Sequence, residues 1–365
     1  SYGPTNAQID ISYLTFHDII HKGSATSNAI VGFTCANNKT TNTNPHITMD
    51  HVQVKHNSDA ELSGSMPLFV LFNMGSIRIT NSSFNSSIGG VGGCFYISGF
   101  HTVYSEKNQF YKCKGRDVGG VMYLLDNGSI NETTVNGQPV AQRTVTFKND
   151  EYFGNRTERD GGAIAITGTS SKLIDVTIEN CNFENNYGKL ESGAVWLNVV
   201  GNVTVKNSMF CGNTGNRRAG AIFIKGNPNG LLTVDGCYFS ENTDNAMGSG
   251  AIFTEVPFDI KNCLFLNNKS TGTEPAPDSK GGAISAEAKA RGSITNCKFV
   301  GNWSVGNGGA IFTTGSVMDV KLSNNFFQGN QAGLGGAVYN ENAASKITMS
   351  NNQFTGNQAA NGGAV

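Results

Sequence analysis

Short runs in which apolar and polar residues alternate recur along the whole chain, and most of them lead to a phenylalanine. The residues five and seven positions before it are apolar, as Val203 and Val205 are before Phe210. Alternation with a period of two places both side chains on one face of a β-strand, which we expect to face a core. Gly and Asn interrupt the runs, so the pattern predicts short strands joined by turns rather than helices.

These strands belong to a repeated unit that contains two sequence motifs, Phe-x-x-Asn and Gly-Gly-Ala-Ile. The second motif and its variants are called the glycine word. A step of 27 residues separates Ala194 from Ala221, and the same step separates Ala283 from Ala310. A fixed period of this length with strand patterning indicates a stacked solenoid. We therefore predict an all-β fold, a parallel β-helix (solenoid) of about twelve coils with a basic period of 27 residues. The residue at the Phe position of each coil is called its anchor, and the anchors are Phe16, Val54, Phe84, Phe110, Tyr152, Phe183, Phe210, Phe239, Phe265, Phe299, Phe327 and Phe354.

Stacking of equivalent positions predicts the interior of this solenoid. The anchors should form an aromatic column, and the asparagines of the repeat should form amide ladders. An Asn three residues before most anchors, such as Asn207, indicates a bend, because Asn tolerates the left-handed conformation. Glycine pairs are expected at corners where the backbone needs positive φ or a close approach.

One solenoid is expected over residues 1–365, with degenerate coils and loop insertions in 1–150 and regular coils in 151–365. The chain stops partway round a coil, which predicts a fragment or a subunit with open ends. Copies stacked head to tail, with Val365 against the strand expected at 7–11, would cover such ends.

Complete copies of the Gly-Gly-Ala-Ile and Phe-x-x-Asn motifs occur over residues 160–365. They resemble the motifs of the chlamydial polymorphic outer-membrane proteins and similar β-helix surface proteins. This resemblance implies a right-handed β-helix and the adhesive passenger domain of an extracellular or cell-surface protein.

Composition excludes several classes of function. Charged residues are 15% of the chain and the net charge is -1, so no basic field is available for nucleic acid or an anionic membrane. The longest apolar run, 66–72, is too short to form a transmembrane helix. No Cys-x-x-Cys or His-Glu-x-x-His motif occurs, and we expect no metal and no cofactor.

Acidic residues are scattered, whereas glycoside cleavage needs paired carboxylates that face one groove. The best local cluster is Glu158 and Asp160 beside Asp117, all just before glycine words, where charged side chains are ordinarily solvated. We therefore predict that the protein is not an enzyme, with a β-helix polysaccharide lyase or hydrolase kept as an alternative.

A column of aromatic residues lies two positions after the Ala of the glycine word, interrupted by Ala165 and Ser285. Because the β-branched residue before each one should face the core, alternation turns these rings outward. Such a stripe would serve binding or assembly; the alternatives are that the strand bends and the rings join the core, or that a loop covers them. The predicted stripe is Tyr96, Tyr123, Trp196, Phe223, Phe253, Phe312 and Tyr339.

Three cysteines, Cys237, Cys263 and Cys297, lie two residues before the anchors of consecutive coils. Stacked coils bring equivalent Cα atoms within disulfide range, so one bridge among them is possible. The alternative is that they are small core residues in a column where other coils have Ser or Asn.

Nine Asn-x-Ser/Thr sequons occur. Four of them, at Asn81, Asn155, Asn268 and Asn302, occupy ladder positions, where an inward amide could not carry a sugar. The candidates for N-glycosylation are Asn38, Asn85, Asn127, Asn131 and Asn202.

Together these features predict a non-enzymatic extracellular rod that assembles head to tail into a fibre or surface appendage and carries glycans. The partners expected are further copies of the chain, glycans or other surface proteins, without nucleic acid and without a transmembrane segment in this chain. An adhesin-like module that binds a glycan or a receptor through the stripe is the alternative.

Overall fold

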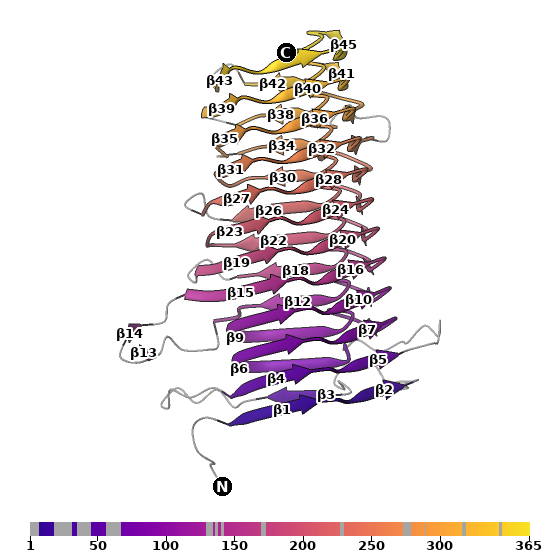
Figure 1. The fold of residues 1–365 in the computed structure, drawn as a ribbon, viewed down its shortest axis with the longest axis vertical. Coiled ribbons are helices and arrows are strands. Elements are labelled where there is room, and N and C mark those ends of the chain that lie inside the picture. The colour runs from indigo at the N-terminus through magenta and orange to yellow at the C-terminus, as the bar shows by residue number, and fades with distance from the viewer. Residues whose placement is uncertain are drawn as a thin grey trace.

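The chain forms an all-β parallel solenoid whose strands stack from the N-terminal end to the C-terminal end (Figure 1). Because every coil repeats the same order of strand, bend and corner, each strand pairs in parallel with its equivalent in the next coil. The computed structural model describes residues 7–17, 31–34, 45–55, 67–128, 134–135, 138–139, 142–168, 173–226, 230–272, 279–288, 290–315, 319–342 and 345–365.

Three parallel sheets make up the walls of the solenoid in the described residues. They are called sheets A, B and C. Sheet B has twelve strands, one for each anchor. The predicted alignment of the anchors is therefore confirmed, including Phe16 opposite Val54. Sheet B consists of β2 (Thr15–His17), β5 (Gln53–Lys55), β7 (Ser83–Asn85), β10 (Gln109–Tyr111), β16 (Glu151–Phe153), β20 (Asn182–Glu184), β24 (Met209–Cys211), β28 (Tyr238–Ser240), β32 (Leu264–Leu266), β36 (Lys298–Val300), β40 (Phe326–Gln328) and β44 (Gln353–Thr355).

Sheet A has the largest number of strands, 21. Strands β6 (Phe69–Thr80) and β9 (Phe95–Glu106) cross it without a break. In later coils the same path is divided in two, and β12 (Met122–Leu125) and β15 (Gln142–Lys148) both pair with β9. Loops leave the rod at this division. The first halves that follow β12 include β18 (Ile164–Thr167), β22 (Val195–Val199), β26 (Ile222–Gly226), β30 (Ile252–Thr254) and β38 (Ile311–Thr313).

Sheet C has ten short strands, from β8 (Ile88–Gly89) to β45 (Gln358–Asn361). A corner follows each of them and leads back to sheet A. In the corner at Gly308 and Gly309, the first glycine has a φ of +70°, and a Cβ on the second would lie 2.0 Å from the carbonyl oxygen of Gly336 in the next coil. Glycine is required there because backbone packs against backbone.

The bends before sheet B are also as predicted. The Asn three residues before the anchor has positive φ in all eight coils that carry it, for example 47° at Asn207 and 55° at Asn262. Positions without this Asn keep the conformation with other residues, as His51 and Lys107 show. The coil geometry therefore dictates the bend, and Asn is the residue with a side chain that adopts it at the lowest cost, while Gly236 adopts it in one coil.

Two continuous columns fill the interior next to sheet B. The anchor rings from Phe84 to Phe354 are stacked, with centroids 4.5–5.2 Å apart. Three residues after each of the last eight anchors, from Tyr152 to Phe354, asparagines form a ladder from Asn155 to Asn357, in which each amide Nδ2 donates to the next Oδ1 at 2.9–3.0 Å. Both predicted columns are thus confirmed.

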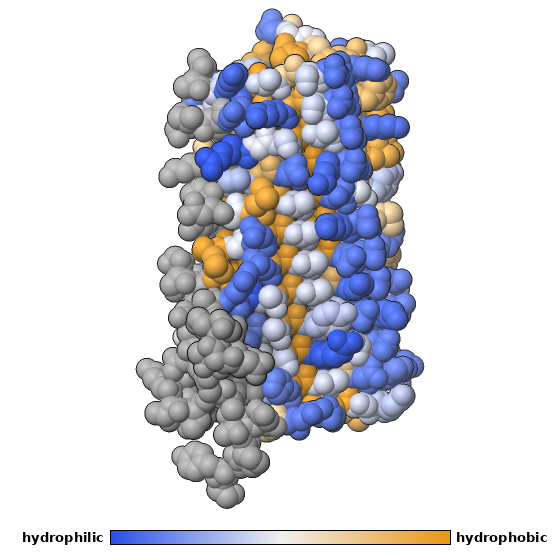
Figure 2. Space-filling model, turned by 60° about the vertical axis from the view of Figure 1, so that its left-hand side comes forward, coloured by the Kyte–Doolittle hydropathy of each residue, from blue (hydrophilic) through white to orange (hydrophobic). Residues whose placement is uncertain are grey.

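The long insertion after β12 is closed at its base by a buried ion pair. The Nε of Arg143 lies 3.6 Å from Oδ2 of Asp126, and both side chains are fully buried. On the outside of the rod, residues of like hydropathy form stripes along its length (Figure 2). The same stacking therefore orders the surface as well as the core.

Candidate functional site

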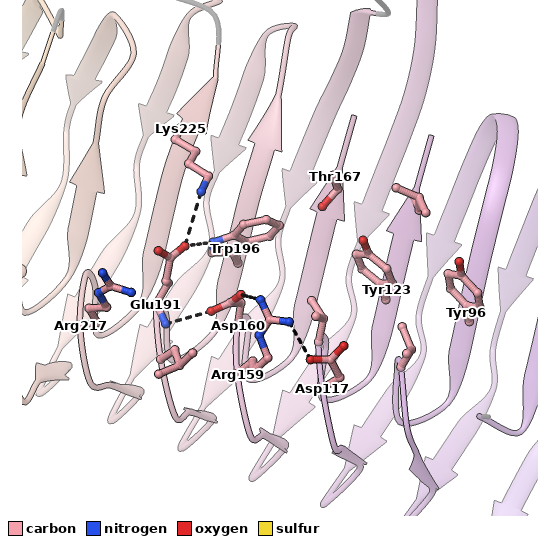
Figure 3. Close-up of a pocket in the computed structure, with 14 residues that line it drawn as sticks. Tyr96, Asp117, Tyr123, Arg159, Asp160, Thr167, Glu191, Trp196, Arg217 and Lys225 are labelled. Carbon is pink, nitrogen blue, oxygen red and sulfur yellow. Dashed lines mark hydrogen bonds and ion pairs between the residues drawn. The ribbon is translucent and has the colours of Figure 1, made fainter. Parts of the chain in front are cut away.

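A groove of about 760 Å³ runs beside the predicted aromatic stripe. It lies between the outer face of strands β9, β12, β18, β22 and β26 and the corners that precede them (Figure 3). Five coils contribute, so the groove extends over roughly 19 Å, four strand spacings. Its lining combines aromatic, charged and aliphatic residues, namely Val91, Tyr96, Asp117, Val118, Tyr123, Leu125, Arg159, Asp160, Thr167, Leu190, Glu191, Trp196, Arg217 and Lys225.

The groove coincides with a break in the aromatic column. Tyr123 pairs with Ala165 in the next coil, and Ala165 pairs with Trp196. On the other side, the rings of Tyr96 and Tyr123 are stacked, with centroids 5.6 Å apart and an interplanar angle of 6°. Because Ala165 carries no ring, the face of Tyr123 that points away from Tyr96 has no ring of the next coil to stack on.

Charged side chains from successive corners lie along the lower edge of the groove in Figure 3. Nη1 of Arg159 donates to Oδ1 of Asp117 at 3.0 Å, and its Nη2 lies 3.7 Å from Oδ2 of Asp160. The backbone N–H of Glu191 donates to Oδ1 of Asp160 at 3.2 Å. Arg159 therefore joins two carboxylates that come from neighbouring coils.

The far end of the groove is built around Trp196. Its indole Nε1 donates to Oε2 of Glu191 at 2.6 Å, and Nζ of Lys225 lies 3.8 Å from the same oxygen. Lys225 also lies over the Trp196 ring, 5.3 Å from its centroid. These contacts fix the orientation of the indole, so this end of the groove is preorganised.

The surroundings shift several pKa values in the groove. Burial raises the pKa of Asp160, and the nearby Glu191 adds to this effect. The hydrogen bond to Asp117 raises the pKa of Arg159, and burial raises that of Tyr123. Glu158, which the sequence grouped with Asp160, is not a lining residue; it pairs with Lys189 at 3.2 Å and with Lys114 at 3.9 Å, and its pKa is lowered mainly by Lys189.

The prediction of an exposed aromatic stripe is wrong for most of its length. The rings do point away from the main core, but Trp196, Phe223, Phe253 and Phe312 are buried. Trp196, Phe223 and Phe253 form a second apolar cluster with Val118, Ala165 and Ala219, which belong partly to the adjoining corners.

Basic side chains also lie over these aromatic rings and shield them from solvent. Arg218 lies over Phe253 at 5.2 Å from the centroid, Lys225 over Phe223 at 5.7 Å, and Lys280 over Phe312 at 5.4 Å. Only Tyr96, Tyr123 and Tyr339 of the predicted stripe are half-buried and so retain accessible ring surface. Alternation predicted the direction of the rings, but it contains no information about the corners that cover them.

The disulfide that the sequence left possible among Cys237, Cys263 and Cys297 is not present in the structure, where all three are free thiols. They are buried, and the backbone N–H of Cys237 and of Cys263 points to the sulfur of the next cysteine at 3.4 and 3.5 Å. The thiols thus take the place of the Ser and Asn acceptors in this column, which is the alternative that the sequence left open.

The sequons divide by burial. Asn155, Asn268 and Asn302 are fully buried in the ladder, as expected. Asn81 does not point inward: it lies at an exposed bend and donates to Asp50, so the prediction for this residue is wrong. Of the candidates for glycosylation, Asn85, Asn127 and Asn202 are exposed, whereas Asn38 and Asn131 lie outside the described residues.

Sequence reasoning named Tyr96, Tyr123, Trp196, Asp117 and Asp160 but did not bring them together. It did not single out Glu191, Arg217 or Lys225. The one feature of the sequence that could have located the site is the interruption of the aromatic column at Ala165, which is visible when the repeats are aligned. In the described part of the chain, no group of three or more His, Cys, Asp or Glu residues could hold a metal ion.

Residues 193–365 match the family model described as "Right handed beta helix region". A stretch of 105 residues is 34% identical to the probable autotransporter YfaL of Escherichia coli (strain K12), covering 26% of this chain and 8% of that protein. The chain thus spans only a small part of this relative's length. No solved structure matches the chain significantly. Fold and family match together define the class of the protein, a parallel β-helix.

The described residues contain no helix that is long and apolar enough to cross a membrane.

Proposed function

We propose that this chain is a rigid, non-enzymatic β-helix rod at a cell surface, which binds a neutral saccharide in the groove between Tyr96 and Lys225. The observation that carries the proposal is the break at Ala165, which leaves one face of Tyr123 without a stacked neighbour, beside the fixed Asp117–Arg159–Asp160 chain. The similarity to an autotransporter supports the location at the surface.

The chemistry of the lining favours a saccharide. Aromatic faces contact the apolar face of a sugar ring, and planar carboxylate and guanidinium groups offer paired acceptors and donors to its hydroxyl groups. Three carboxylates (Asp117, Asp160 and Glu191) are balanced by three cations (Arg159, Arg217 and Lys225). Because the lining of the groove has no net charge, it favours a neutral ligand over a charged one. Its length fits an oligosaccharide.

The same contacts argue against cleavage. Hydrolysis of a glycoside needs one carboxylic acid to donate a proton and a second carboxylate to act as base or nucleophile. Here the guanidinium of Arg159 joins the carboxylates of Asp117 and Asp160, so both are engaged in ion pairs, and the charge of Arg159 lowers the pKa of Asp160 against the larger effect of burial. We therefore propose recognition without reaction at this site.

The test is a binding assay of the full chain on immobilised neutral and anionic oligosaccharides. We expect binding to at least one neutral oligosaccharide, and a loss of affinity of at least about 10-fold for Tyr123→Ala and for Arg159→Ala, the equivalent of one stacking contact or paired hydrogen bond. Tyr339→Ala is the matched control, because Tyr339 occupies the same column position outside the groove.

Absence of binding to every neutral oligosaccharide would contradict the proposal, as would an equal loss in the Tyr339→Ala variant. Binding of anionic oligosaccharides alone would overturn the class of ligand. Shortened products after incubation with a bound oligosaccharide would show that the protein is an enzyme.

A second proposal concerns assembly and modification. Each coil pairs with the next in one parallel register, so copies could stack head to tail through the same backbone hydrogen bonds. The exposed sequons Asn85, Asn127 and Asn202 are accessible to glycosylation. Electron micrographs and the intact mass of native material should show filaments with an axial repeat of roughly 50–60 Å, about twelve strand spacings, and a mass above that of the polypeptide. Isolated rods at the bare polypeptide mass would refute both.

A further inference from the structure

Two cysteines, Cys94 and Cys113, stand at repeat positions where the regular coils carry other residues. Cys94 stands in the glycine word Gly92-Gly93-Cys94, where the regular coils have Ala. Cys113 stands three residues after the anchor Phe110, where the regular coils have the ladder Asn. At no other glycine word is the Ala position Cys, and after no other anchor is the Asn position Cys.

The fold brings these two exceptions into contact. Cys94 and Cys113 are free thiols in the structure, but their Sγ atoms lie 3.1 Å apart, and both side chains are fully buried in the main core. The backbone N–H of Cys113 still donates to Oδ1 of Asn155, so Cys113 keeps the backbone position of a ladder residue. Cys94 lies at the glycine corner before β9, and Cys113 lies between β10 and β11 (Lys114–Gly115), one coil before the first ladder residue, Asn155.

We propose that Cys94 and Cys113 form a structural disulfide when the protein folds in an oxidising compartment. The two sulfurs need to approach by only about 1 Å to reach bonding distance. The two thiols lose two protons and two electrons as the S–S bond forms, and a disulfide oxidant such as oxidised glutathione takes up the electrons and is reduced to two thiols. This cross-link goes beyond the proposed function and does not depend on the groove.

Burial determines when the bond forms. The thiolate is the reacting species, and burial, together with the neighbouring Cys113, raises the pKa of Cys94 well above its usual value. Oxidation therefore takes place while the coil is still open, and the closed core then protects the bond from reductants. The bond closes a short loop, since only 19 residue positions separate the two cysteines.

The Cys237, Cys263 and Cys297 column provides a contrast within the same chain. The sulfurs of Cys263 and Cys297 accept from backbone N–H groups of the preceding coil, as the Ser and Asn residues of other coils do. Cys263 and Cys297 thus occupy acceptor positions of a ladder, whereas Cys94 and Cys113 come from two different positions of the repeat and meet each other. A single experiment separates the two sets of thiols.

The full chain is directed to the bacterial periplasm, and its free thiols are blocked with N-ethylmaleimide in denaturant. After trypsin digestion without reductant, we expect the peptide 79–107 to be joined to the dipeptide 113–114, and Cys237, Cys263 and Cys297 to be alkylated. Alkylated Cys94 and Cys113, or a bond from either of them to another cysteine, would overturn the proposal.

Melting temperatures provide a second readout. Reduction in denaturant, followed by refolding and melting in excess reductant without blocking the thiols, should lower the melting temperature of the wild type by roughly 5 °C, as expected for a loop of this size. The variants Cys94→Ala and Cys113→Asn restore the residues of the regular repeat, so they preserve the packing, and the same treatment should not change their melting temperatures. An equal decrease in these variants would also refute the cross-link.

Discussion

Replacement of Asn213 by leucine is expected to destabilise the rod by about 4 kcal/mol, because several buried hydrogen bonds lose a partner at once. The side chain of Asn213 lies in the middle of the ladder and is fully buried. Its Nδ2 donates to the carbonyl oxygen of Phe183 and to Oδ1 of Asn242, both at 2.9 Å. Its Oδ1 accepts from the backbone N–H and from Nδ2 of Asn186.

Leucine has the same number and branching of side-chain heavy atoms as asparagine, with a somewhat larger volume, but offers none of these partners. It leaves the backbone N–H of Asn186 and the carbonyl oxygen of Phe183 without the ladder amide in a dry interior, at about 1–3 kcal/mol for each group. The free energy of unfolding, obtained from urea denaturation followed by circular dichroism, measures the effect.

Asn207→Gly is the matched control in the same coil. Asn207 is exposed and has a φ of 47°, a conformation that glycine adopts without strain. This variant should change the free energy of unfolding by less than about 1 kcal/mol. Equal losses in the two variants, or a loss below about 1 kcal/mol in Asn213→Leu, would show that the ladder is not a source of stability.

The second large effect is a dependence of stability on pH that comes from Asp150. This residue lies two positions before the anchor Tyr152, where other coils have Asn, Ser or Cys, and burial raises its pKa to about 7. Its Oδ1 accepts from the backbone N–H of Asn108, and the Tyr152 hydroxyl lies 3.3 Å from its Oδ2. Tyr152 and Cys181 are the titratable groups that act on it, and neither supplies a positive charge.

The sign follows from proton binding. Between the unfolded pKa of 3.8 and the folded value of about 7, the folded state binds more protons than the unfolded state. The contribution of Asp150 to stability is therefore greatest below pH 3.8 and is lost as the pH rises to 7, with a total change of about 4 kcal/mol.

Asp150→Asn isolates this contribution, because asparagine occupies the same position in other coils, as Asn325 shows. We expect the variant and the wild type to have similar free energies of unfolding at pH 4, and the variant to be more stable at pH 8 by up to about 4 kcal/mol. Groups such as Asp244, whose pKa is also raised to about 7, are present in both proteins and cancel in the comparison. A difference that is constant with pH, or that grows toward low pH, would contradict the assignment.

Most of the scaffold could be predicted from the sequence because it is repetitive. The position of each anchor follows from Phe-x-x-Asn, and parallel stacking requires that equivalent residues meet, so the aromatic column, the amide ladder and the bends at positions such as Asn207 all follow from the period. Each of these features depends on contacts between identical positions in successive coils, which a one-dimensional alignment of the repeat represents well.

The candidate site could be predicted only in part because it depends on contacts between different positions of the repeat. The alignment gave the outward direction of Trp196 and Phe223, but the tertiary structure decided that the corners and the side chains of Arg218 and Lys225 cover them. Likewise, Asp117, Arg159 and Glu191 meet Tyr123 and Trp196 only because the corner of one coil lies against the strands of its neighbours.

The sequence by itself therefore determined the period, the parallel stacking of the coils and the composition of the core, since these follow from local alternation and from the stacking of equivalent residues. The tertiary structure decided which outward residues stay accessible, where the aromatic column opens into a groove, and which two cysteines meet. The physical reason is that burial and side-chain contact outside the core depend on how corners and loops pack on the strands, and the repeat pattern does not specify that packing.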